Sequence, residues 1–236
     1  MKKFTTLLLL FTAIISFSQT LTGNQLLEKS IQFHDPNGNW DAFKGSFIVT
    51  MKTPKNSPRK SYVEINLPEE YFLVKAIKDT LVTQYTLRKG ICSMAINGNT
   101  TPSEELLKKH KLSCERANLY KNYYTYLYGL PMKLKDEGTI IHQKTTTKTF
   151  KGKEYLVLKV TYTKEVGKDT WYFYFDPKTY AMEVYQFFKE KKESGEYILL
   201  TGLETVHDIK MPKERAWYYN KNDGYLGVDI LSKTAQ

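Results

Sequence analysis

Hydrophobic and polar residues alternate along most of the chain, at the two-residue spacing that is typical of β-strands. In the first half, the alternating runs are Phe47–Val49, Tyr62–Ile65, Phe72–Ala76, Val82–Leu87 and Cys92–Ile96. Turn sequences rich in Pro, Gly, Asn and Lys separate these runs, such as the Asn-Gly-Asn at residues 97–99. This order predicts an antiparallel meander.

A second series of strands follows Gly138. Its alternating runs are Thr139–Phe150, Tyr155–Tyr162, Thr170–Phe175, Ala181–Phe188, Tyr197–Val206, Ile209–Tyr218 and Gly227–Leu231. Asp176-Pro177 and Gly152-Lys153 have the composition of hairpin turns. Neither a linker nor a change in composition divides the two series, so we expect one domain with about a dozen strands.

Helical spacing occurs at the start of the mature chain and again between the two series. Thr22 and Gln25 form a capping box before an amphipathic run that ends at the turn sequence of residues 35–39. In the middle, a capping box that begins at Thr101 predicts a helix over Pro102–Lys109. A second helix is predicted from Glu115 to Tyr128, with a tyrosine-rich side.

So few helices can cover only part of a large sheet. An antiparallel sheet of this size has two faces, and one of them has to be buried. We therefore expect a mainly β (α+β) fold, in which a curved antiparallel half-barrel sheet is covered by a few short helices. Where the helices do not fill the concave side, a cavity remains. Thr170–Phe175 carries aromatic side chains on both faces, which fits either a packed core or a ligand pocket.

The N-terminus has the pattern of a secretory signal peptide. Met1–Ser18 contains two lysines, the apolar run Leu7–Ile15, and small residues before Gln19. An uncleaved membrane anchor is the alternative, but the apolar run is shorter than the roughly 20 residues that cross a bilayer. We expect cleavage after Ser18 and a mature domain of residues 19–236 without a transmembrane segment.

Export changes the interpretation of the two cysteines. Cys92 and Cys114 are the only cysteines of the chain, and an even pair in an oxidising compartment usually forms a disulfide. They are not at the Cys-x-x-Cys spacing of redox-active pairs or of cysteine metal sites. We therefore predict a structural disulfide between them.

Known catalytic motifs are absent from the sequence, including the nucleophile elbow, the zinc-peptidase helix, the phosphate-binding loop and the dinucleotide-binding fingerprint. The four histidines, His34, His110, His142 and His207, are far apart, and we expect each at the surface or in a turn. Acidic and amide residues alternate from Asp35 to Asp41, but the pattern lacks the glycine and glutamate of a calcium loop. We predict no metal, no cofactor and no enzymatic activity.

The charge is strongly positive, with 35 Lys and Arg against 25 Asp and Glu, a formal net charge of +10. Basic clusters at residues 52–60 and 189–192 lie near predicted hairpin ends, where cations protect edges from pairing with other chains. Attraction to anionic headgroups or envelope polysaccharide is the functional alternative. Because the chain is exported and its charge is scattered, we expect no nucleic-acid partner.

Two resemblances follow from these features. The order of signal peptide, helix, meander, helical insert and second meander resembles that of the LolA-like lipoprotein carriers. More narrowly, the stretches His34–Trp40, Tyr120–Met132 and Asp169–Pro177 resemble an uncharacterised family of exported Gram-negative envelope proteins. The resemblance implies a LolA-like half-barrel and a role in holding a lipid or an acylated protein.

Together, the residues and the resemblance predict a periplasmic, outer-envelope or secreted protein that binds an apolar, lipid or acylated ligand without chemistry. An envelope protein that binds a partner through its surface, with a core filled by its own side chains, is the first alternative. An enzyme whose site has no recognisable sequence motif is the second. The expected ligand-binding residues are aromatic or aliphatic side chains of the second central helix and of one strand: Tyr120, Tyr123, Tyr124, Leu127, Tyr172 and Tyr174. The oligomeric state is left open.

Overall fold

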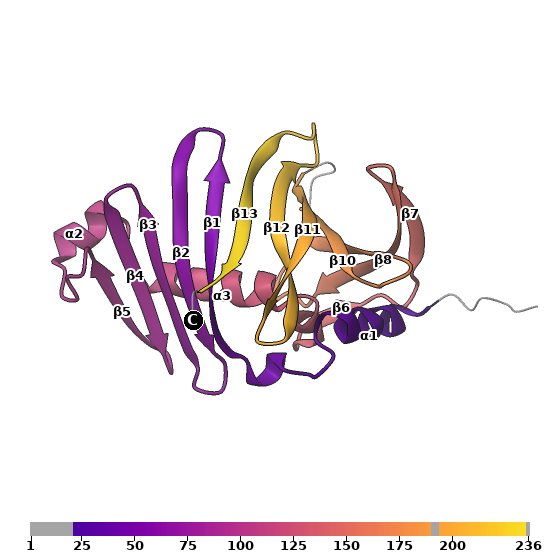
Figure 1. Cartoon of the computed structure of the whole chain (residues 1–236), viewed down its shortest axis with the longest axis horizontal. Helices are drawn as coiled ribbons and strands as arrows, with labels where there is room; N and C mark the ends of the chain where they lie inside the picture. The colour runs from indigo at the N-terminus through magenta and orange to yellow at the C-terminus, as the bar shows by residue number, and fades with distance from the viewer. Residues whose placement is uncertain (1–20, 190–193, 235–236) are drawn as a thin grey trace, which may run out of the picture.

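The computed structural model describes residues 21–189 and 194–234, so the expected signal peptide and part of the basic cluster at 189–192 lie outside the described residues. The described residues form one 13-stranded antiparallel sheet (Figure 1). Its first meander consists of β1 (Lys44–Thr53), β2 (Asn56–Asn66), β3 (Tyr71–Lys78), β4 (Leu81–Arg88) and β5 (Ile91–Ile96). All five of the strands predicted in this half are confirmed.

The second series contains β6 (Thr139–Ile141), β7 (Thr146–Phe150), β8 (Lys153–Tyr162), β9 (Thr170–Phe175), β10 (Met182–Phe188), β11 (Glu196–Val206), β12 (Ile209–Tyr219) and β13 (Tyr225–Lys233). The last strand, β13, pairs with the first, β1, and this pairing joins the two meanders into one sheet. The strand order is therefore β5-β4-β3-β2-β1-β13-β12-β11-β10-β9-β8-β6, with β7 also paired to β8.

The prediction of one strand over Thr139–Phe150 is wrong, because the segment forms two strands. β6 pairs with the end of β8, whereas β7 pairs with its beginning. Between them, the chain is held by the residues that precede the first helix. Lys144 bridges to Thr22, and the Thr145 hydroxyl donates a hydrogen bond to the Leu21 carbonyl at 2.6 Å. This tertiary contact overrides the continuous alternation of the sequence.

Three α-helices accompany the sheet: α1 (Gly23–His34), α2 (Glu104–Lys109) and α3 (Cys114–Gly129). The capping box of Thr22 and Gln25 at the start of α1 is confirmed. The predicted start of α2 is wrong by two residues, because Ser103 caps the helix and accepts a hydrogen bond from the Leu106 amide at 3.3 Å. Short 3-10 helices span Trp40–Ala42 and Met132–Lys135.

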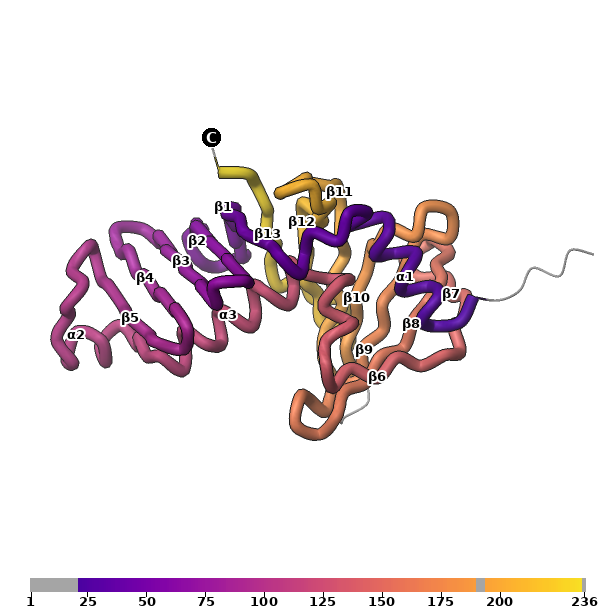
Figure 2. The backbone as a smooth tube through the Cα atoms, turned by 90° about the horizontal axis from the view of Figure 1, so that it is seen from below, coloured from indigo at the N-terminus to yellow at the C-terminus, as the bar shows by residue number. Residues whose placement is uncertain are grey.

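Helix α3 runs across the strands on one side of the sheet, and the sheet bends on either side of it (Figures 1 and 2). The main hydrophobic core lies between this helix and the inner face of the sheet, and it includes Phe47, Phe72, Tyr124 and Tyr128. A smaller cluster around Tyr174 lies on the outer face, near β7. The fold is therefore a curved sheet with one main buried side.

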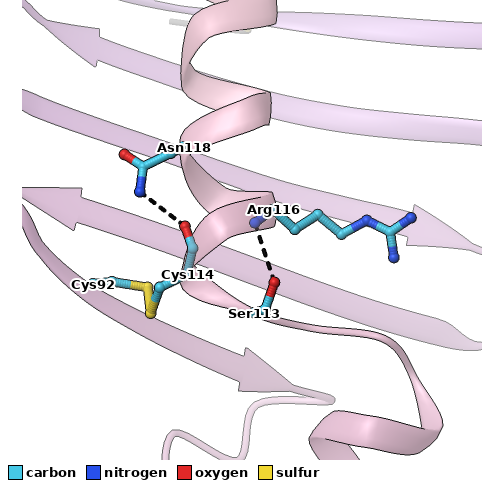
Figure 3. The surroundings of a disulfide bond; sticks show 5 residues. All are labelled: Cys92, Ser113, Cys114, Arg116 and Asn118. Atoms are coloured by element: carbon cyan, nitrogen blue, oxygen red, sulfur yellow. Dashed lines mark hydrogen bonds between the residues drawn. A yellow bond between two sulfur atoms is a disulfide. The ribbon is translucent and has the colours of Figure 1, made fainter.

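The disulfide joins α3 to the outermost strand of the first meander. Cys92 on β5 is bonded to Cys114, the first residue of α3, with a Cα–Cα distance of 5.8 Å (Figure 3). At the same end of the helix, the Ser113 hydroxyl accepts a hydrogen bond from the Arg116 amide at 3.2 Å. The start of α3 is thus held both covalently and by a helix cap.

Reduction of this disulfide should lower the free energy of unfolding by about 3 kcal/mol, because it releases a closed loop with a sequence separation of 22. Urea denaturation of the Cys92→Ala, Cys114→Ala double variant and of the parent measures the difference. Thiol labelling of the exported, denatured parent should detect no free cysteine. Equal midpoints, or two labelled thiols per chain, would contradict the disulfide's role.

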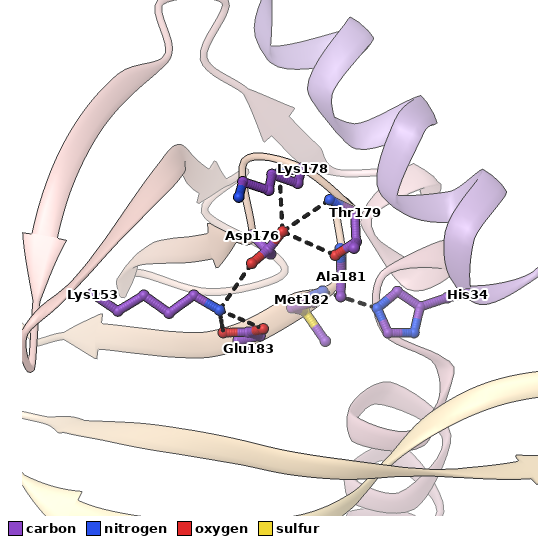
Figure 4. Close-up of polar contacts among 8 residues, drawn as sticks. All are labelled: His34, Lys153, Asp176, Lys178, Thr179, Ala181, Met182 and Glu183. Atoms are coloured by element: carbon purple, nitrogen blue, oxygen red, sulfur yellow. Dashed lines mark hydrogen bonds and ion pairs between the residues drawn. The ribbon is translucent and has the colours of Figure 1, made fainter.

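His34 is fully buried, so the prediction of a surface or turn position is wrong for this residue. Its Nε2 accepts a hydrogen bond from the Met182 amide at 2.9 Å, and its Nδ1 bonds to the Lys210 carbonyl at 2.6 Å. The imidazole therefore joins the end of α1 to β10 and β12 (Figure 4). Burial lowers its pKa to about 4, because the charged form would lose solvation, and the nearby cations Arg215 and Lys210 also disfavour it.

The turn next to His34 is fixed by an ion-pair network. Lys153 on β8 pairs with Asp176 at 2.9 Å and with Glu183 at 2.6 Å (Figure 4). The Asp176 carboxylate also accepts hydrogen bonds from the Lys178 and Thr179 amides, both at 2.9 Å. These bonds hold the pKa of Asp176 well below its usual range, with Lys153 as the largest cause. They explain why Asp176-Pro177 forms the predicted hairpin turn.

Stability should fall as the pH is lowered from about 6.5 to about 4, because unfolded His34 takes up a proton that the folded residue excludes. The loss is about 3 kcal/mol, from roughly 1.4 kcal/mol for each pH unit between the two pKa values. Urea denaturation across this range should give a flatter profile for His34→Gln than for the control His110→Gln. Parallel profiles for the two variants would refute this assignment.

Candidate functional site

A cavity of about 770 Å³ lies between α3 and the second half of the sheet. Its walls are mainly aromatic, and they come from α3, β8, β9, β10 and β12: Tyr123, Tyr126, Tyr162, Trp171, Phe187 and Trp217. Lys133, Asp136, Lys168, Asp169 and Lys189 contribute charged groups to the lining. The site therefore combines an apolar interior with charged residues.

The strands and the helix place these side chains by simple geometry. Trp171 and Phe187 are cross-strand partners on β9 and β10, and their rings stack with centroids 4.8 Å apart. Tyr126 on α3 meets the Trp171 ring edge to face at 6.0 Å. Its hydroxyl shares a short hydrogen bond with Tyr162 on β8, and burial raises the pKa of Tyr162 to about 12. The polar ends of these rings thus bond to each other.

A second cavity of about 220 Å³ adjoins the first. Tyr123 and Trp217 line both cavities, and their rings stack at 6.4 Å with an interplanar angle of 19°. On the side of the second cavity, they are joined by Met51 and Asp229, among others. The stacked pair therefore forms the partition between an open apolar cavity and a smaller one that reaches a buried carboxylate.

That carboxylate belongs to a polar cluster inside the half-barrel. Asp229 is 4% exposed and accepts a hydrogen bond from the Tyr123 hydroxyl at 2.8 Å. Burial raises the pKa of Asp229, although hydrogen bonds from Tyr123 and Trp217 oppose the rise. Arg215 is also buried and donates to the Pro212 carbonyl at 2.8 Å. The cluster has opposite charges on neighbouring strands beneath α3.

A family model described as a family of unknown function, DUF6503, matches residues 2–233. The chain belongs to this family. None of the curated proteins matches the sequence.

Among solved structures, a LolA superfamily protein from Nitrosomonas europaea is similar to this DUF6503 chain, with 11% identity and a TM-score of 0.53. The match covers 92% of this chain and 95% of the other. A DUF1329 family protein from Desulfovibrio piger has 10% identity and a TM-score of 0.49, over 90% and 92% of the two chains. The similarity to the Nitrosomonas europaea protein shows that the DUF6503 chain has a LolA-like fold, and the predicted membership of an uncharacterised family with this fold is confirmed.

The described residues contain neither a metal-binding cluster nor a membrane-spanning helix. No group of three or more His, Cys, Asp or Glu side chains there is arranged to hold a metal ion. In the same part of the chain, no helix is both long and apolar enough to span a membrane. The Asp35 carboxylate, part of the pattern that resembles a calcium loop, accepts hydrogen bonds from the Asn39 and Trp40 amides, both at 2.8 Å. This turn geometry explains the alternating polar residues.

The residues proposed from the sequence occupy three different places in this DUF6503 protein. Tyr123 and Leu127 line the large cavity. Tyr120 and Tyr124 lie on the side of α3 that faces the first meander. Tyr120 packs against Tyr85 on β4, and Tyr124 packs against Phe72 on β3.

Tyr172 and Tyr174 belong to the cluster on the outer face of the sheet, away from the cavity. Their neighbours in β9, Trp171 and Phe173, face the inner core instead. Both sets of alternate positions in Thr170–Phe175 are aromatic, so the alternation cannot indicate which set faces inward. The wall residue Trp171 was missed for this reason. Phe187 on β10 and Trp217 on β12 were missed as well, because the inward side of these strands is set by strand pairing.

Tyr123→Phe should lower the free energy of unfolding by about 1–3 kcal/mol, because the buried Asp229 carboxylate loses a hydrogen-bond donor. Urea denaturation at pH 7 measures this loss. The control is Tyr225→Phe, since the Tyr225 side chain is 46% exposed and its ring lies outside the cavity. An unfolding free energy of Tyr123→Phe equal to that of the control would contradict the role of this bond.

Proposed function

We propose that the protein is an exported envelope protein that binds an apolar or acylated ligand, without changing it chemically. The observation that carries this proposal is the open cavity of about 770 Å³ beside α3, with its aromatic walls. Its volume lies within the roughly 300–1,000 Å³ that is typical of small-molecule sites. A ligand there is a lipid or the acyl chains of an acylated protein.

Binding would be driven by the removal of apolar surface from water. Each methylene of an acyl chain that enters the cavity contributes roughly 0.8 kcal/mol. Trp171, Phe187 and Leu127 offer apolar surface to such a chain, and Tyr123 forms the end wall towards the smaller cavity. The LolA-like fold supports the proposal, because the resemblance to lipoprotein carriers implies the same use of a half-barrel.

Binding also fits the state of the polar groups in the wall. Lys133 forms an ion pair with Asp136, and the hydroxyls of Tyr126 and Tyr162 bond to each other. These groups therefore satisfy one another around an apolar space. The proposal assigns them to holding the shape of the site and assigns no catalytic step.

The proposed location is the periplasm or outer envelope of a Gram-negative cell, or the medium outside it. The signal-peptide pattern of Met1–Ser18 supports export. The disulfide between Cys92 and Cys114 supports an oxidising compartment, because such bonds persist there and are rare in the cytosol.

The alternative is an interaction protein with a filled core. One observation favours it: Tyr124 and Tyr128 on α3 are 1% and 0% exposed, so they occupy much of the concave side of the sheet themselves. In that case, the first meander is simply packed, and a partner binds to the basic surface. The two functions differ in whether the second half of the sheet accepts a ligand.

Two adjacent residues of β9 provide a matched test, because Trp171 lines the cavity and Tyr172 lies on the outer face. Trp171→Ala should weaken the binding of the neutral apolar dye N-phenyl-1-naphthylamine about tenfold, whereas Tyr172→Ala should change it less than twofold. A fluorescence titration of the mature protein measures both values. Equal effects of the two variants, or no binding by the parent, would exclude the cavity as the site.

A further inference from the structure

The cavity adjoins a buried cation that has no ion pair. Arg215 is 1% exposed, and its guanidinium donates to the carbonyls of Pro212 and Leu127 at 2.8 and 3.3 Å. Its Nε–H has no hydrogen-bond partner, and no carboxylate within the described ranges forms an ion pair with it. Burial of a guanidinium in this state is costly, because buried charges are normally paired.

Two tyrosine hydroxyls near Arg215 also lack partners. Tyr128 and Tyr185 are both 0% exposed, and neither hydroxyl is hydrogen-bonded to another described residue. The Arg215 guanidinium lies 3.9 Å from the centre of the Tyr128 ring. It also lies near the Tyr185 hydroxyl, because it lowers the pKa of Tyr185 against the larger, opposite effect of burial. The Arg215 Nε–H and the two hydroxyls are thus gathered without a hydrogen-bond partner among the described residues, and such buried groups normally bond to water or to a ligand.

The carboxylate opposite Arg215 in the sheet does not form an ion pair with it. Arg59 and Arg215 both interact with Asp229, the carboxylate of the cluster. Asp229 is the cross-strand partner of Arg215, yet its carboxylate accepts a hydrogen bond from Tyr123 and does not pair with the guanidinium. The buried guanidinium of Arg215 is therefore left without a direct ion pair among the described residues. A water molecule would supply an acceptor for the free donors, but only an anion would also supply the missing charge.

The unpaired donors lie directly behind the inner wall of the large cavity. Leu127 lines the cavity, and its carbonyl accepts a hydrogen bond from Arg215. The Tyr185 ring contacts two wall residues, with centroid distances of 6.1 Å to Trp171 and 6.3 Å to Trp217. Leu127, Trp171 and Trp217 therefore form a wall that the cavity and this cluster share.

We propose that Arg215, Tyr128 and Tyr185 bind the oxyanion head group of an amphiphilic ligand whose hydrocarbon chain occupies the cavity. The head group is a carboxylate or a phosphate, which accepts from the Arg215 Nε–H and from the two hydroxyls. Hydrogen bonds between a cation and an oxyanion are the stronger kind. This inference rests on the proposed function and adds the chemical class and the orientation of the ligand.

Four ligands with the same chain separate the charge of the head group from the apolar contribution. These are oleate, oleyl phosphate, oleyl alcohol and oleylamine, delivered from cyclodextrin to the mature protein. The fluorescence of Trp171 and Trp217, which line the cavity, reports binding. One or both anions should bind at least tenfold more tightly than the alcohol, and the amine should bind no more tightly than the alcohol. The two anions show whether a carboxylate or a phosphate is preferred.

Tyr185→Phe and Tyr128→Phe test the donors themselves. Each should weaken binding of the preferred anion three- to tenfold and leave oleyl alcohol unchanged. Because the hydroxyls have no hydrogen-bond partner among the described residues, neither variant should lower the denaturation midpoint of the protein without ligand added. Arg215→Met should abolish the preference for anions, and the tyrosine variants carry the test if it fails to fold. Tyr155→Phe, on the outer face, is the matched control.

Three results would overturn the inference. If the anions and the alcohol bind equally, the cavity binds an apolar chain without recognising its head group. The proposed function then stands, and the inference about the head group is wrong. If none of the four ligands binds, the proposed function fails as well. If the tyrosine variants lower stability and leave anion affinity unchanged, the hydroxyls bond to internal water.

Discussion

The structure depends on how the concave face of one open sheet is removed from water. Thirteen strands form this sheet, and α3 is the helix that crosses its inner side. A single helix cannot cover so wide a face, so the two halves of the sheet are covered to different extents. Over the first meander, Tyr124 and Tyr128 are buried against Phe72 and Phe47. Over the second half, a cavity with aromatic walls remains between helix and sheet.

The position of α3 is determined by bonds at both ends. The disulfide between Cys92 and Cys114 holds its start on the edge strand, and Arg215 holds the Leu127 carbonyl near its end. Between these points, Tyr123 bonds to Asp229 and forms the partition between the two cavities. Hydrophobic burial thus holds the helix against the sheet, and the disulfide and the polar bonds fix its position along the sheet. One of these polar groups, the buried guanidinium of Arg215, lies behind the apolar cavity.

The sequence predicted the strands well, because their two-residue alternation and turn chemistry are local. The sequence-based predictions were wrong where tertiary contacts determine the local structure. Contacts with Thr22 and Leu21 divide the segment after Gly138 into β6 and β7. Hydrogen bonds with Met182 and Lys210 hold His34 in the interior. The site was only partly predictable. The helical spacing that brings Tyr123 and Leu127 to one side of α3 is local, whereas the inward side of β9 depends on strand pairing. Arg215 gave no local signal, since a basic residue in a strand is normally exposed.

The central claim is that the cavity beside α3 holds an amphiphilic ligand in the cell. Native mass spectrometry of the exported protein, purified without detergent, tests it most directly, when combined with solvent extraction and analysis of the extract. The account predicts an adduct at a stoichiometry of one, which the extract identifies as a lipid or an acylated species. A mass equal to that of the mature chain alone, unchanged after incubation with oleate or with envelope lipids, would contradict it.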